Sequence, residues 1–235
     1  MISTREEIVY RILKIAAALA VAQFAAAAST LPCAVASLSS YDASGFSCAE
    51  SGLTFSNFRF LASGTAALPA DGSVELTPLA DGFDFTAPFT ASAGTALDIT
   101  IEYVVSDPAG ILGDQLSIAG FGASGSGALD LAETVCPGAV LTCAAPLASL
   151  NVFDNATGFQ SAAAVTFAAP QSAIGIVKDL SLTGGSGLSS AAVSLIDNAT
   201  PFAASGPPPV PEPGAALLIG LCLLTLAARW RKLRR

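Results

Sequence analysis

The chain has 235 residues, of which 52% are hydrophobic and only 12% are charged, and it contains no histidine. Charged residues usually make up about a quarter of a soluble domain, so the mean hydropathy of +0.64 is high. Much of the apolar excess is alanine, and much of the rest lies near the two ends. Without histidine, the sequence excludes Ser-His-Asp and Cys-His catalytic sets and every histidine-ligated zinc site.

Residues 1–28 are typical of a secretory signal peptide. Arg5, Arg11 and Lys14 form a basic region, and the apolar run Ile15–Ala28 follows and ends in four alanines before Ser29. Small residues at this point suit a cleavage site. Because the run is short for a membrane span of about 20 residues, we expect cleavage near Ala28 rather than an uncleaved anchor helix.

Residues 29–205 show strand-like runs and no long window of helical periodicity. In the clearest run, residues 97–105, five apolar side chains share one face and three polar ones point the other way, as in a half-buried antiparallel strand. The apolar face consists of Leu97, Ile99, Ile101, Tyr103 and Val105, and the polar face of Asp98, Thr100 and Glu102.

About nine further strands are expected, separated by turn signals such as Ser106-Asp107-Pro108. They are residues 53–61, 73–79, 82–86, 115–121, 128–135, 147–153, 163–168, 174–182 and 191–196. Short strands at this spacing predict one all-β domain, an antiparallel sandwich of about ten strands that is immunoglobulin-like or jelly-roll-like. Six phenylalanines are expected in its core rather than on a ligand platform: Phe55, Phe58, Phe60, Phe83, Phe85 and Phe89.

Four of the five cysteines lie in this domain, and the fifth, Cys222, lies in a C-terminal apolar run. An even number in an exported chain indicates two disulfides, and four cysteines allow three pairings. We favour the local pairing of Cys33 with Cys48 and of Cys136 with Cys143. The alternative interpretation is a four-cysteine zinc site. Such a site usually has two pairs of cysteines separated by two to four residues, and the cysteines here are farther apart.

The charge of the domain differs from that of the whole chain. Eight of the ten basic residues lie at the two ends, which leaves only Arg59 and Lys178 in between; of the 18 acidic residues, all but Glu6, Glu7 and Glu212 lie in the domain. Its 15 acidic and two basic residues give a net charge of about −13. We therefore expect no binding to nucleic acid, because that affinity depends on neutralising phosphates. An acidic, soluble surface fits an extracellular setting.

Two pairs of carboxylates are candidate functional sites. Asp107 and Asp114, with loop carbonyls nearby, could supply calcium ligands, but the D-x-D-x-D-G pattern is missing. Asp98 and Glu102 could serve a secreted carbohydrate-active hydrolase, but their shared strand face favours a solvated surface. We expect no catalytic residues, no metal site and no cofactor.

The C-terminus has three parts in a fixed order. Residues 206–213 are a Pro-rich linker, which favours extended polyproline II structure. Residues 214–229 are expected to form a single transmembrane helix, whose short reach Trp230 and snorkelling basic side chains can extend. Residues 230–235 form a basic tail, which the positive-inside rule places in the cytoplasm, with the domain outside.

This tail closely resembles the PEP-CTERM sorting signal, over residues 210–235. The resemblance rests on the motif and on a basic cytoplasmic stop: Val210, Pro211, Glu212 and Pro213, and then Arg229, Arg231, Lys232, Arg234 and Arg235. It implies a Gram-negative host and processing near Pro-Glu-Pro by exosortase, a membrane-embedded transpeptidase. An ordinary tail anchor is the alternative.

The domain is loosely similar to exported PEP-CTERM proteins of unassigned role. The shared stretches are residues 55–58 (FSNF), the paired cysteines and residues 178–182 (KDLSL). This similarity implies no catalytic residue.

Together these features predict an exported, non-enzymatic protein of the cell surface or of a biofilm matrix. The precursor would be anchored in the inner membrane with its domain in the periplasm, and the mature form would lie at the cell surface or outside the cell. Exosortase, the membrane and a matrix exopolysaccharide are the expected partners. The alternative is an ice-binding or adhesive protein with the same C-terminal segment, although its threonines are scattered rather than in ladders.

Overall fold

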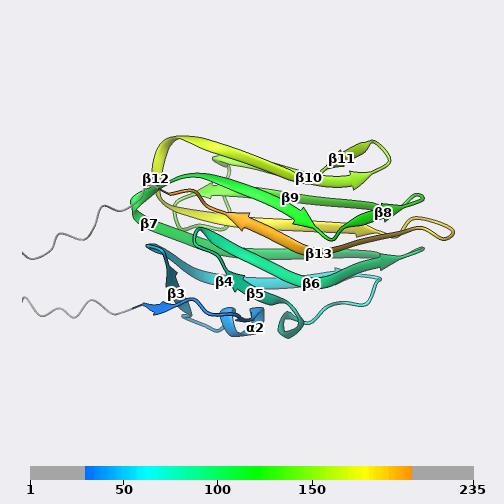
Figure 1. The fold of residues 1–235 in the computed structure, drawn as a ribbon, viewed down its shortest axis with the longest axis horizontal. Helices are drawn as coiled ribbons and strands as arrows, with labels where there is room; N and C mark the ends of the chain where they lie inside the picture. The colour runs from blue at the N-terminus through cyan, green and yellow to red at the C-terminus, as the bar shows by residue number, and fades with distance from the viewer. Residues whose placement is uncertain (1–29, 203–235) are drawn as a thin grey trace, which may run out of the picture.

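The computed structural model describes residues 30–202 (Figure 1). The expected signal peptide, Pro-rich linker, transmembrane helix and basic tail lie outside the described residues. Those residues form thirteen strands and two short helical turns, α2 (Leu38–Tyr41) and η1 (Asp71–Ser73). Neither turn has the length or hydropathy to cross a membrane.

Nearly all the strand pairs are antiparallel, and the parallel pair β1–β3 is an exception. The strands are β1 (Leu31–Pro32), β2 (Ala36–Ser37), β3 (Ser47–Glu50), β4 (Leu53–Gly64), β5 (Glu75–Pro78), β6 (Gly82–Ser92), β7 (Ala96–Ala119), β8 (Gly122–Ser124), β9 (Ala128–Pro137), β10 (Ala148–Asn155), β11 (Gly158–Gln160), β12 (Ala162–Thr183) and β13 (Ser190–Ala199).

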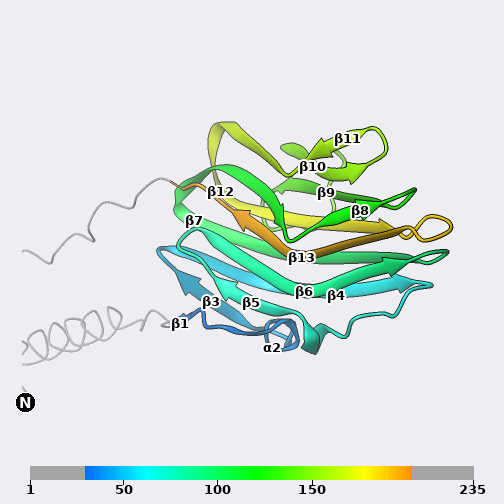
Figure 2. The same ribbon diagram turned by 45° about the vertical axis from the view of Figure 1, so that its right-hand side comes forward.

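Two long strands, β7 and β12, connect the two layers of the sandwich. They pair with each other along both halves, but their other neighbours change at the middle. The first half of β7 pairs with β4, and its second half pairs with β13. One layer is therefore β11-β10-β9-β12-β7-β4-β3-β1, and the other is β12-β7-β13-β6-β5-β2. Figures 1 and 2 show the long strands running along the length of the molecule.

The expected turn at Ser106-Asp107-Pro108 is wrong, because β7 continues through it. Instead of reversing, the strand bends: Asp107 Oδ1 accepts a hydrogen bond from the Ala109 N–H at 2.8 Å, and Gly110 takes a φ of 106°. The facing part of β12 shows register shifts between Thr166 and Ala173. Such bulges bend a strand without ending its pairing, so the expected strands on either side merge into one.

The interior confirms the predicted faces of the clearest strand. Its five apolar side chains, from Leu97 to Val105, are all buried, and Asp98 points to solvent. The predicted phenylalanine core is also confirmed: five of the six rings are buried and Phe60 is partly buried. Phe83 of β6 packs edge-on against Phe55 of β4, with ring centroids 4.7 Å apart. This contact joins the two layers face to face, since β4 and β6 share no hydrogen bonds in the sheet topology.

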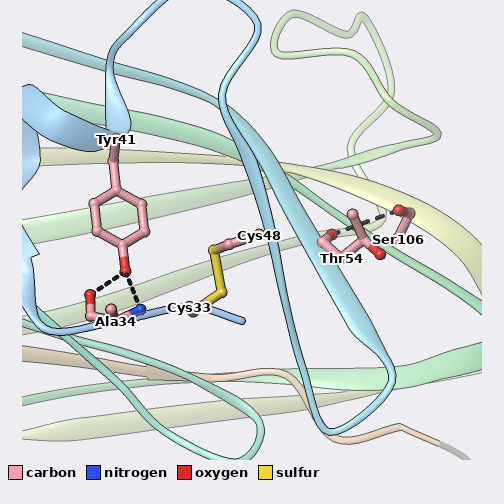
Figure 3. Close-up of a disulfide and its surroundings, with 6 residues drawn as sticks. All are labelled: Cys33, Ala34, Tyr41, Cys48, Thr54 and Ser106. Carbon is pink, nitrogen blue, oxygen red and sulfur yellow. Dashed lines mark hydrogen bonds between the residues drawn. A yellow bond between two sulfur atoms is a disulfide. The ribbon is translucent and has the colours of Figure 1, made fainter. Parts of the chain in front are cut away.

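Both predicted disulfides are present, Cys33–Cys48 and Cys136–Cys143. Figure 3 shows how the first fastens the N-terminal segment: Tyr41 Oη donates a hydrogen bond to the Ala34 carbonyl at 2.6 Å, beside the disulfide to β3. The second closes the loop that crosses β12 at Gly175. A Cβ atom on Gly175 would lie 1.8 Å from the Val140 carbonyl oxygen, so only glycine allows this close approach.

Candidate functional site

A group of polar side chains lies inside the sandwich, where apolar contacts would be expected. Lys178, Glu133, Asp114 and Asn198 are buried to 1% exposure or less. Lys178 and Glu133 come from one layer, on β12 and β9, and Asp114 and Asn198 come from the other, on β7 and β13. Together with Tyr103, these four residues form the interlayer cluster.

An ion pair forms the first half of the interlayer cluster. Lys178 and Glu133 lie directly opposite each other in the β12–β9 register. The Lys178 Nζ donates a hydrogen bond to Glu133 Oε2, and neither side chain reaches solvent. A buried ion pair pays a large desolvation cost, so it is weak evidence for stability alone.

Asn198 organises the second half. Its Nδ2 donates to Asp114 Oδ1 at 3.1 Å and to the Gln115 carbonyl at 2.7 Å. Its Oδ1 accepts a hydrogen bond from the Tyr103 hydroxyl. Thr200 Oγ1 adds a long contact of 3.5 Å to the same Asp114 oxygen. Asp114 Oδ1 is thus surrounded by donors, as a carbonyl-type oxygen would be.

The carboxyl groups of Asp114 and Glu133 contact each other between the two layers. Asp114 Oδ2 and Glu133 Oε1 are buried and have no donor. A proton between the two groups satisfies both oxygens, since an ionised carboxylate can only accept. Burial, followed by the charge and the hydrogen bond of Glu133, raises the pKa of Asp114 well above its ordinary value, and Lys178 and Asn198 offset this in part. Asp114 therefore keeps its proton to a higher pH than an exposed aspartic acid does.

The composition of the cluster is chemically unusual for a core. It places the Lys178 side chain and the two carboxyl groups of Glu133 and Asp114 together away from water, and Glu133 contacts the other two. Burial, followed by the charges of Glu133 and Asp114, also raises the pKa of Tyr103 well above 10, so its hydroxyl remains a donor to Asn198.

From the sequence, Asp114 was a candidate calcium ligand, and neither Glu133 nor Asn198 was predicted to join it in a site. The signal was present as an interruption of an apolar face. Lys178 stands in line with Ile174, Ile176, Leu180 and Leu182, and Glu133 stands in line with Leu129, Leu131 and Val135. A charged residue on the buried face of an alternating strand predicts a buried partner on the neighbouring strand.

The other weighed carboxylates do not gather into a site. Glu102 lies on the outer face, where its Oε2 is 3.8 Å from Arg59 Nη1. Asp98 lies on the same face and is exposed. Asp107 caps the bend of β7, and no group of three or more His, Cys, Asp or Glu side chains suited to a metal occurs among residues 30–202.

Two surface depressions are open and small. One, of about 320 Å³, lies between the ends of β4, β6 and β13 and is lined by Thr, Ser and Ala side chains such as Thr90 and Ser190. The other, of about 230 Å³, is lined by residues 42–46 and 57–59. Neither includes Asp98, Glu102 or the interlayer cluster.

The family model for the PEP-CTERM protein-sorting motif matches residues 209–232. This confirms the predicted sorting signal: the chain carries a PEP-CTERM motif, which implies export and sorting to the cell envelope. The match covers the C-terminal segment and leaves the role of the β domain unassigned. A search of the curated proteins found no match.

Several solved structures are weakly similar to parts of this chain. TmCBM61 in complex with β-1,4-galactotriose is 12% identical over 60% of this chain and 88% of its own, with a TM-score of 0.31. The enzymatically active domain of tailspike protein 4 from bacteriophage CBA120 is 12% identical over 63% of this chain and 19% of its own, with a TM-score of 0.29. Xylanase10C from Cellvibrio japonicus is 12% identical over 63% of this chain and 28% of its own, with a TM-score of 0.25. The chain thus spans less than a third of these last two. Such similarities transfer no binding site or activity.

Proposed function

We propose that this chain is an exported, non-enzymatic protein of the cell surface or extracellular matrix, processed by exosortase through its C-terminal signal. The PEP-CTERM motif at residues 209–232 is the observation that carries this proposal. The anchored precursor would hold its β domain in the periplasm, and the mature protein would reach the cell surface or the medium.

In this proposal Pro211-Glu212-Pro213 is the recognition element. A Pro-rich segment is stiff and extended, so it can enter a narrow active site without first unfolding. Glu212 supplies one charge between two rigid residues. The positive-inside rule places the basic residues from Arg229 to Arg235 in the cytoplasm, and in this proposal they stop the chain in the membrane until it is processed.

The acidic surface of the β domain supports an extracellular role. Of its two basic residues, Lys178 is inside the sandwich, so Arg59 is the one exposed cation in residues 30–202. The surface is more acidic than the composition alone indicates. A matrix exopolysaccharide bound by such a surface would be neutral rather than anionic, because an anionic chain would be repelled.

The position of the chain ends fits presentation from a membrane. Phe202 pairs with Ile111 beside the bend of β7, and Leu112 N–H donates to the Pro201 carbonyl at 2.7 Å. Figure 2 shows that β13 ends at the same end of the molecule as β1. Both ends of the described chain therefore lie at one end of the long axis of the sandwich. This arrangement suits a domain that projects from a membrane anchor.

The experiment is a Glu212→Ala substitution in a host that carries exosortase. We expect an unprocessed, membrane-bound precursor that retains Trp230. A Glu75→Ala chain, altered at an exposed glutamate of β5, is the control and should mature at the normal rate. If the Glu212→Ala chain also matures normally, and deletion of residues 214–235 merely secretes the body, then the tail is a plain anchor and the proposal fails.

A further inference from the structure

The interlayer cluster holds every group that an internal amide bond would require. Lys178 supplies an amine, Asp114 supplies a protonated carboxyl group, and Glu133 lies between them. Glu133 Oε2 accepts from Lys178 Nζ, and the carboxyl group of Glu133 also shares a side-chain hydrogen bond with Asp114. The one carboxyl group of Glu133 is thus in contact with both partners of a possible condensation.

We propose that Lys178 and Asp114 condense to an isopeptide bond that cross-links the two layers, with Glu133 as the catalytic acid and base. This goes beyond sorting and does not depend on it.

The reaction balances without a cofactor or an oxidant. The Glu133 carboxylate takes a proton from the Lys178 ammonium, and the freed amine attacks the Asp114 carboxyl carbon. One C–N bond forms and the C–Oδ2 bond breaks. Glu133 passes its proton to the departing oxygen and takes another from the nitrogen, so one water leaves. The core then contains a neutral amide and a protonated Glu133, with no net change in charge.

The hydrogen bonds place each Asp114 oxygen in its required role. Oδ1 accepts from Asn198 Nδ2 at 3.1 Å and from Thr200 at 3.5 Å, so these donors stabilise the negative charge that develops there when the amine attacks. Oδ2 is buried and has no such donor, so it is the oxygen that leaves. Tyr103 acts as a positioning residue, because its hydroxyl bond to Asn198 Oδ1 directs Nδ2 toward Asp114.

The buried environment of the interlayer cluster favours the reaction, and the bond that forms would stabilise the fold. Burial disfavours charged forms, so it favours the neutral carboxyl group of Asp114 that the amine attacks. The product removes the ion pair whose desolvation the fold otherwise bears. It would also tie β7 to β12 across the sandwich, which a protein exposed outside the cell can use as a permanent brace.

Peptide mapping of the full chain after denaturation and disulfide reduction tests the proposal. We expect a branched peptide joining the segments around Lys178 and Asp114, lighter than their sum by one water. Trypsin should cut after Arg59 and fail to cut after Lys178. Because the readout is on internal peptides, processing of the chain ends does not affect it.

Variants separate the roles. Glu133→Gln keeps the shape of the side chain and removes the base, so it should leave Lys178 unmodified and open to trypsin. Lys178→Met should lose the bond and lower Tm by about 10 °C, as the loss of a cross-link closing a long loop would. Asp130→Asn, on the outward face of β9, is the control and should keep the branched peptide.

Two results would overturn the proposal. One is an unbranched Lys178 peptide of full mass from the folded wild-type chain, which needs no variant to fold. The other is a cross-link from Lys178 to Asn198 with loss of ammonia, which would show that Asn198 and not Asp114 is the acceptor.

Discussion

Asp84 and Asp197 lie directly opposite each other on β6 and β13, and both carboxyl groups are partly buried. Burial, followed by the charge of Asp197, raises the pKa of Asp84. Burial raises the pKa of Asp197, with a smaller contribution from Asp81, and the Ser117 hydrogen bond opposes it. The fold therefore brings two carboxyl groups together at a cost that depends on pH.

This pair predicts that the free energy of unfolding falls as the pH rises above about 4. A raised folded-state pKa means that the native chain binds more protons than the unfolded chain between the unfolded and the folded pKa values, so stability is full below the unfolded value and is lost across that window. Urea titrations from pH 3 to 7 measure it. Asp84→Asn should flatten the curve and stabilise the protein by about 0.5 kcal/mol at pH 7, and Glu75→Gln should not. A curve of unchanged slope in Asp84→Asn would contradict the assignment.

The Cys33–Cys48 disulfide predicts a local and a global effect. Its sequence separation is 15, and a loop of that length corresponds to about 3 kcal/mol of stability. Replacing both cysteines by alanine should lower the free energy of unfolding by this order. It should also loosen the N-terminal segment, which is then held by the Tyr41 hydrogen bond to Ala34 and by the short β1–β3 pairing. Limited proteolysis of residues 30–50 reads the local effect, and equal protease resistance of the two chains would count against it.

An alanine at Gly175 should clash with the disulfide loop, whereas an alanine at Gly122 should not. A Cβ at Gly175 would meet the Val140 carbonyl at 1.8 Å, while one at Gly122 would meet nothing within 4 Å. Gly175→Ala should cost about 1–3 kcal/mol, because the disulfide loop must move off β12. Gly122→Ala should cost much less. Chemical denaturation of both variants makes the comparison, and equal midpoints would show that the loop does not press on the sheet.

The non-enzymatic proposal predicts that the purified protein leaves a panel of polysaccharides uncleaved. Glu102 Oε2 lies 3.8 Å from Arg59 Nη1 on the outer face, Asp98 is exposed on the same face, and neither lines one of the two surface depressions. Release of reducing ends measures cleavage. Activity in the wild-type chain that disappears in Glu102→Gln would establish a hydrolase instead.

The strand faces were predictable because each buried strand alternates. Leu97 to Val105 shows this period, and both disulfides follow from short sequence separations. The passage of β7 from one layer to the other was not predictable, because Asp107, Pro108 and Gly110 are typical turn residues and nothing local distinguishes a bend from a reversal. The short strands β1, β2, β3, β8 and β11 were missed because two to four residues are too few to show a period.

The interlayer cluster was only partly predictable. Lys178 and Glu133 interrupt apolar faces, which indicates buried charge, but their partnership depends on β9 and β12 being neighbours. Asp114 and Asn198 reach the cluster from the other layer, through the long strand that the turn signal concealed. The sorting signal, by contrast, is a linear motif, and its three parts stand in sequence order.

The most direct test of the central claim is mass spectrometry of the mature C-terminus, from the native host and from the same host without exosortase. The account predicts a new C-terminus near Pro211-Glu212-Pro213 in the wild type and an intact, membrane-bound chain ending at Arg235 in the deletion strain. The same processed body in the medium of both strains would contradict it.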